Sequence, residues 1–178
     1  MRKMMALKEN NIKFIQGFGK LPIYADYISH VFDDEAAIWK QYLMEAFQLP
    51  QFFLDKGLHP FIFQPDNSNQ TIIGTIEPSN DGIREFPFSL FIQKPDLNHE
   101  EDLEHCIHIW HFLIIVRWQL SQIQDISECY AYLETQRIDI SKKEKLPDAL
   151  LKKLGNFLIN ARLQTLIIGN DIDFTFGE

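Results

Sequence analysis

A group of histidines and glutamates in the second half of the chain has the residue types and spacing of a metal-binding site. The group comprises Glu101, Glu104, His105, His108 and His111. Steps of three and four residues bring side chains to one face of a helix, where imidazole and carboxylate groups can bind a transition metal. The zinc-hydrolase pattern H-E-x-x-H does not occur. The favoured interpretation is a polar helix face directed to water, with Glu101, His105 and His108 as the candidate metal ligands.

The segment GFGKLPIYADY, residues 17–27, has the glycines and the lysine of a nucleotide-binding loop. Gly17 and Gly19 permit backbone angles that other residues avoid. However, the pattern G-x-x-x-x-G-K-[ST] is absent, and Leu21 stands where a magnesium-binding hydroxyl is needed. A G-x-G pair without a third glycine is no better as a dinucleotide signal. We therefore expect no nucleotide and no other cofactor at this segment.

The polar residues of the same segment have two interpretations. Pro22 stiffens the chain, and Asp26 follows it near the expected start of a new element. The favoured role of Asp26 is to accept backbone N–H groups and so hold the turn. The alternative is that Lys20, Asp26 and Tyr27 are presented on a rigid loop to a partner protein.

The segment PSNDGIREFPF, residues 78–88, is rich in turn-forming residues. Its Arg84 can pair bidentately with a carboxylate or with backbone carbonyl groups. We favour an ion pair of Arg84 with Asp81 or Asp26, which would connect the two segments, over capture of a ligand. Phe86 and the residues that follow it are expected to enter the core as the next strand begins.

Signals for covalent catalysis are missing from the sequence. Neither G-x-S-x-G nor a protease-type cysteine motif occurs, and Ser79 has no local signature of a nucleophile. Cys106 and Cys129 are the only cysteines, and their spacing matches no zinc or thioredoxin pattern. Buried thiols in a reducing cytoplasm are the simplest interpretation, and a disulfide remains an alternative. We expect no enzyme activity.

Length and charge favour one acidic, cytoplasmic domain. The chain has 178 residues, of which 46% are hydrophobic, so one domain over residues 1–178 can bury a substantial core. Residues 21–136 hold 5 Lys/Arg against 18 Asp/Glu, a balance of −13. This charge disfavours nucleic acid and suits a basic protein partner or simple solubility. No apolar run has the length of a signal peptide or a membrane span.

Hydrophobic periodicity predicts the elements that position these residues. Strands are expected at residues 12–18, 61–63, 71–76, 88–92 and 129–133, with a closing hairpin at 163–176. Helices are expected after Asp33 or Asp34, from residue 99 or 100 to about 124, and from Pro147. The strands 71–76 and 88–92 should form an antiparallel pair, and residues 141–145 a solvated link. Helices before, between and after strands predict an α/β fold with three α-β-α layers: a mixed, mostly antiparallel sheet with helices on both faces.

The order of the motifs resembles that of the TagF/ImpM family, accessory proteins of bacterial type VI secretion systems. In this family a G-K-L-P-x-x-G-D-F stretch precedes a tryptophan-bearing helix and a P-S-x-D-x-x-G-R-x-F-P-L stretch. The first half of this chain has all three parts in that order, with Trp39 in the sequence IWKQYL. Ala25 and Tyr27 stand where the family usually has glycine and phenylalanine, and the second stretch is one residue shorter.

The resemblance implies a non-catalytic regulator of type VI secretion that acts after translation. The implied partner is a cytosolic scaffold with a forkhead-associated domain, and the implied effect on secretion is negative. The motif residues that would bind the partner or hold the motifs in place are Gly19, Lys20, Pro22, Asp26, Tyr27, Trp39, Ser79, Asp81, Arg84, Phe86 and Pro87. The alternative is an accessory enzyme that depends on a small ligand or a metal and uses the same two loops.

Overall fold

The computed structural model describes residues 11–21, 27–46, 58–63, 69–80, 85–95, 101–144 and 167–168. The elements within them are β1 (Ile12–Phe14), β2 (Gln16–Lys20), β3 (Tyr27–His30), α2 (Asp34–Ala46), β4 (His59–Phe63), β5 (Gln70–Asn80), β6 (Glu85–Pro95), α3 (Glu101–Gln122), α4 (Ile126–Thr135), β7 (Arg137–Asp139) and β8 (Ile167–Ile168). This mixture of helices and strands confirms the predicted α/β class. None of the described helices has both the length and the apolar character that crossing a bilayer requires.

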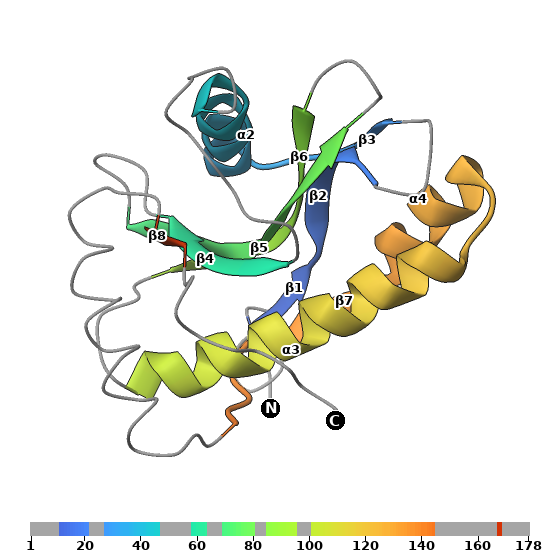
Figure 1. Ribbon diagram of the computed structural model, residues 1–178. Coiled ribbons are helices and arrows are strands. Elements are labelled where there is room, and N and C mark those ends of the chain that lie inside the picture. The colour runs from blue at the N-terminus through green and yellow to red at the C-terminus, as the bar shows by residue number, and fades with distance from the viewer. Residues whose placement is uncertain are drawn as a thin grey trace.

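Six of the strands form one sheet in the order β3-β2-β6-β5-β4-β8, and every pairing between them is antiparallel (Figure 1). The predicted pairing of residues 71–76 with 88–92 is confirmed, with Ile73 opposite Ile92. The hairpin is longer than predicted, because Pro78 and Ser79, expected in the turn, continue β5. Pro78 lies opposite Pro87. Neither proline has a backbone N–H to donate, so these two residues exchange no backbone hydrogen bond across the ladder.

Alternate residues of the central strands enter two separate hydrophobic clusters, as expected when successive side chains point to opposite faces. In β5, Ile72 and Ile76 belong to one cluster and Ile73 to the other. The first cluster contains residues of α2, namely Ala36, Trp39 and Leu43. The second contains Cys106, Ile109, Trp110, Leu113, Val116 and Leu120 of α3, with Cys129 and Leu133 of α4. The sheet is thus held by two cores.

The prediction of a strand at residues 129–133 is wrong, because this segment belongs to helix α4. The side chain of Asp125 accepts a hydrogen bond from the backbone N–H of Ser127 and so caps the helix. Cys129 and Leu133 are buried four residues apart, which is the helical spacing. The same two residues also fit an alternating pattern through residue 131, and the short segment gave no means of choosing.

One other predicted strand differs in detail. The single strand expected at residues 12–18 is interrupted at Ile15, and its halves join different sheets: β1 pairs with β7, whereas β2 enters the six-stranded sheet. Helix α2 begins as predicted, with the backbone N–H of Ala37 donating to the carbonyl oxygen of Asp33. The helix expected from Pro147 lies outside the described residues. Of the closing hairpin only β8 is described, and it pairs with β4.

Candidate functional site

The strands that carry the two motifs end at the same edge of the six-stranded sheet (Figure 1). Strand β6 lies between β2, which ends in the first motif, and β5, which contains the start of the second. Gly19 lies opposite Phe88, and Asn80 lies opposite Glu85. The chain therefore leaves and re-enters the sheet at neighbouring positions in both motifs.

An aromatic pair joins the two motifs directly. The rings of Tyr27 and Phe86 meet edge to face, with centroids 5.1 Å apart and planes inclined by 79°. Such pairs stabilise by about 0.5–1.5 kcal/mol beyond the effect of area burial. Tyr27 is 45% exposed, so the pair lies at the surface of the molecule. A partner that touches Tyr27 would therefore meet both motifs at once.

Gly19 of β2 and Pro87 of β6 are in close contact near this aromatic pair. Gly19 has a φ of +113°, a value that other residues rarely adopt. A β-carbon at this position would lie 2.0 Å from the carbonyl oxygen of Pro87. Glycine is therefore required in the first motif both by its backbone angle and by the close approach of the second motif.

Two polar residues of the motifs are buried at this edge. Lys20 is 7% exposed and Ser79 is 5% exposed. The hydroxyl oxygen of Ser79 has no hydrogen-bond partner, a property that it shares, among the described side chains, with the amide oxygen of Gln93. A buried hydroxyl without a partner is unfavourable for folding. Lys20 and Ser79 are thus held beneath the surface, while Tyr27 is open to solvent.

Trp39 lies in the core and not at the surface. It is 0% exposed and its ring stacks on that of Phe61, with centroids 4.2 Å apart. Its indole N–H donates to the hydroxyl of Ser89 (3.2 Å), which in turn donates to the carbonyl oxygen of Thr75 (2.9 Å). Trp39 therefore attaches α2 to β5 and β6, and any effect on a partner would act through the position of this helix.

The remaining motif residues, Pro22, Asp26, Asp81 and Arg84, lie outside the described residues. The ion pair expected between Arg84 and Asp81 or Asp26 accordingly stays a prediction.

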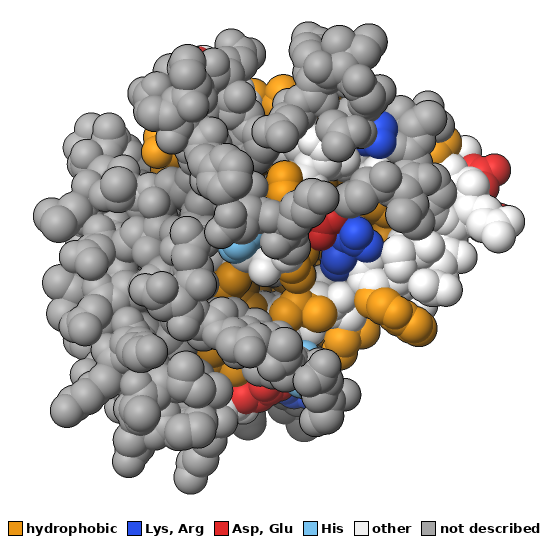
Figure 2. All heavy atoms as spheres, viewed as in Figure 1, with side chains coloured by type: hydrophobic (Ala, Val, Ile, Leu, Met, Phe, Trp, Pro, Cys, Tyr) orange, Lys and Arg blue, Asp and Glu red, His pale blue; other side chains and the backbone are white. Residues whose placement is uncertain are grey.

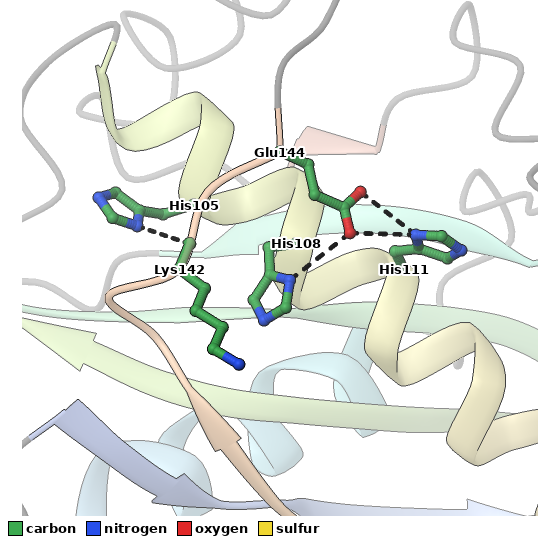
Figure 3. A network of polar contacts seen from close by, with 5 residues as sticks. All are labelled: His105, His108, His111, Lys142 and Glu144. Carbon is green, nitrogen blue, oxygen red and sulfur yellow. Dashed lines mark hydrogen bonds and ion pairs between the residues drawn. The ribbon is translucent and has the colours of Figure 1, made fainter.

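The histidines of α3 contact the segment that follows β7, as Figure 3 shows. The Nδ1 atom of His105 lies 2.9 Å from the carbonyl oxygen of Lys142. The carboxylate of Glu144 contacts both His108 and His111, with Nδ1–Oε distances of 3.5 and 3.2 Å. The backbone N–H of Glu144 also donates to the carbonyl oxygen of Glu104. Residues 141–143 are exposed and lie outside helices and strands, as predicted for a solvated link, whereas Glu144 is half-buried and contacts α3.

The histidine face is thus a packing surface for residues 142–144. His105 contacts the backbone carbonyl group of Lys142, and His108 contacts the carboxylate of Glu144, so the two histidines have different partners. In the part of the chain that the structure describes, no group of three or more His, Cys, Asp or Glu side chains is placed to hold a metal ion. The side chain of Glu101 lies outside that part.

An ion pair that the sequence analysis missed connects α3 to the sheet. The guanidinium of Arg117 contacts the carboxylate of Glu77 through Nε and Nη2, each 2.8 Å from Oε1. Burial raises the pKa of Glu77, and the charge and hydrogen bonds of Arg117 only partly oppose this effect. The available signal was a charged residue at an inward position of a strand, together with an arginine in an otherwise apolar helix.

The surface seen in Figure 2 carries hydrophobic, acidic and basic side chains next to one another. Its described part shows no continuous basic patch, the usual footprint of a nucleic-acid-binding face. The expectation that this acidic chain binds no nucleic acid stays a prediction, because the view covers one face.

Comparison with known proteins gives no further assignment. No protein-family model matches the sequence, and no curated protein matches it. The likeness to the TagF/ImpM family therefore rests on the motif residues alone.

Proposed function

We propose that this chain is a non-catalytic accessory protein of a bacterial type VI secretion system, resembling TagF/ImpM, which acts in the cytoplasm as a negative regulator. It would do so by binding a cytosolic component of the apparatus, with the scaffold bearing a forkhead-associated domain as the expected partner. The binding surface would be the sheet edge at which the two motifs meet. Membrane insertion and nucleic acid play no part in this proposal.

The observation that carries the proposal is the contact of Tyr27 with Phe86 at this edge. Two segments far apart in the sequence contribute to one surface, and their order is the one that the family resemblance rests on. Gly19 of the first motif lies against Pro87 of the second, and Trp39 is hydrogen-bonded to Ser89, the residue that follows the second motif. Residues that the sheet already holds in this way lose little conformational entropy when they bind.

We also propose that the domain has three layers, α-β-α, with α2 and α3 on opposite faces of the sheet. Support comes from the two hydrophobic clusters, which divide the alternating side chains of β4, β5 and β6 between α2 on one side and α3 with α4 on the other. In this arrangement the motif edge lies at the rim of the sheet, where neither helix would prevent a partner from approaching.

Pull-down of the purified scaffold tests the function. Tyr27→Ala, Asp26→Ala and Arg84→Ala should each reduce capture, because they change the proposed surface. Glu45→Ala and Lys143→Ala remove exposed charges elsewhere and should bind like the wild type. Thermal unfolding of each variant controls for loss of the fold. Full capture by all three motif variants, folded and soluble, would exclude this edge as the contact.

A further inference from the structure

The C-terminal half of α3 presents a hydrophobic surface to solvent. Ile115 is 49% exposed and Trp118 is 58% exposed. They lie three residues apart in the helix, so their side chains are neighbours on one side of it. In Figure 2, hydrophobic side chains are visible at the surface over this half of α3, which Figure 1 shows in the same view. We call Ile115 and Trp118 the α3 patch.

The α3 patch lacks the charged neighbours that usually cover the outer face of a surface helix. Residues 105–124 contain no Asp or Glu and one Lys or Arg, although the whole chain has 25 Asp/Glu in 178 residues. That one residue, Arg117, is engaged with the carboxylate of Glu77. The exposed residues that continue the helix beyond the patch are Gln119 and Gln122. The surface is thus apolar at the patch and uncharged on its C-terminal side.

The spacing of the residues along this side of α3 is that of a seam between paired helices. His111, Ile115, Trp118 and Gln122 follow one another at steps of four, three and four residues, the alternation found in coiled coils. Each of them is at least partly exposed. At 3.6 residues per turn, this line lies opposite the buried face of α3 that enters the core. The seam therefore faces away from the sheet.

A second copy of α3 in antiparallel orientation would match this seam to itself. With a two-fold axis between positions 115 and 118, Ile115 of each copy faces Trp118 of the other. The same axis places His111 opposite Gln122, and these two side chains can hydrogen-bond. In a parallel pair, by contrast, each residue would face its own equivalent. The seam is thus self-complementary in the antiparallel register.

Charge also favours a second copy in this register. The net charge of −8 makes two copies repel each other, so self-association needs a surface without acidic residues, which the α3 patch provides. Asp125 and Glu128 are exposed beyond one end of the seam, whereas Lys142 and Lys143 are exposed beside the other. The carboxylate of Glu144, also at the second end, is already in contact with two histidines. Antiparallel packing would bring the unlike charges toward each other at both ends.

We propose that this protein forms a homodimer in which two α3 patches pack antiparallel about a two-fold axis. The centres of protein interfaces are depleted in charged residues and enriched in aromatic ones, and tryptophan often carries much of the binding energy. The helix has 22 residues and is about 33 Å long, so the contact is smaller than a standard interface. We therefore expect a dissociation constant of about 10–100 µM. The inference goes beyond the proposed function and uses none of the motif residues, so either can fail without the other.

Sedimentation velocity of the full chain tests the proposal, at concentrations that extend tenfold below and above this range. The sedimentation coefficient of the wild type should rise with concentration as a monomer–dimer equilibrium requires. Trp118→Lys should raise the dissociation constant at least tenfold. Ile38→Lys, which changes a similarly exposed hydrophobic residue of α2, is the matched control and should dimerise like the wild type. A wild type that stays monomeric, or equal weakening by Ile38→Lys, would overturn the proposal.

A mixing experiment tests the antiparallel register. Ile115→Glu and Trp118→Lys should each dimerise poorly alone, and an equimolar mixture of the two should associate several-fold more tightly. In the mixed dimer the introduced glutamate faces the introduced lysine, while the other Ile115–Trp118 contact is unchanged. Ile115→Glu alone replaces Trp118→Lys in the first test if the latter does not fold. A mixture that associates no more tightly than the separate variants would exclude this dimer.

Discussion

Gly19 in β2 and Pro87 in β6 are in such close approach that a β-carbon on the first would lie 2.0 Å from the carbonyl oxygen of the second. Each belongs to a different motif, and the pairing of Gly19 with Phe88 fixes their relative position. The first motif thus requires a glycine because the strand of the second motif passes so close to it. This dependence gives a structural reason for both motifs to occur in one chain, whatever partner they bind.

Gly19→Ala should lower the free energy of unfolding by about 3 kcal/mol, because the new methyl group meets backbone atoms and the φ of +113° strains any side chain. Chemical denaturation measures the effect. Gln41→Ala, at an exposed position of α2, should change stability by less than about 0.5 kcal/mol. A Gly19→Ala variant that unfolds at the wild-type denaturant concentration would show that the strands are not in close approach.

Glu77 should make stability fall as the pH rises. Burial raises the pKa of Glu77 above its ordinary value of 4.5. At pH values between 4.5 and this raised pKa, the folded protein keeps a proton on Glu77 that the unfolded chain has released. The contribution is fully present below pH 4.5 and is lost as the pH rises through the raised pKa. Glu77→Gln should remove this dependence. The wild type should therefore lose stability relative to Glu77→Gln as the pH rises.

Denaturation curves at several pH values from 4 upward check this sign. Glu45→Gln, an exposed glutamate of α2, is the control and should follow the wild type closely. If the wild type instead gained stability relative to Glu77→Gln as the pH rose, the ion pair with Arg117 would outweigh the effect of burial.

Local patterns in the sequence were sufficient for the longest elements. The helix that became α3 and the pairing of β5 with β6 follow from apolar runs bounded by turn residues, as at Ile73 and Ile92. The pattern failed at Cys129 and Leu133, which fit both a strand and a helix. What decided the outcome was the cap at Asp125 and burial against the rest of the core.

The site depended more strongly on contacts between distant residues. That the two motifs would meet was a hypothesis based on a possible ion pair of Arg84 and on a resemblance, whereas the contact of Tyr27 with Phe86 needs the order of three strands. Glu144 gave no signal at all, because its partners lie on a helix more than 30 residues earlier. Gln16 likewise gave no signal, although its amide oxygen accepts the backbone N–H groups of Phe32 and Asp33.

Trp39 and Ser89 should be coupled in their contributions to stability. Trp39→Phe keeps an aromatic ring in the core and removes the 3.2 Å bond to the hydroxyl, which should cost about 1 kcal/mol of unfolding free energy in addition to the cost of the smaller ring. Ser89→Ala removes the other partner, so the double variant should be less destabilised than the sum of the two. Denaturation of the four proteins measures the coupling. Strictly additive losses would show that the bond contributes nothing.

Glu144 should control the order of residues 142–144 along α3. Glu144→Ala removes the carboxylate that receives His108 and His111 but keeps the backbone bond to Glu104. Charge-assisted hydrogen bonds at half-exposed positions are of modest strength, so we expect the amide of residue 144 to exchange its hydrogen about tenfold faster, equivalent to about 1.4 kcal/mol. Hydrogen exchange followed by NMR gives this rate. Lys143→Ala, an exposed neighbour, should leave it unchanged. Equal rates in the wild type and Glu144→Ala would mean that the backbone bond alone holds the segment against the helix.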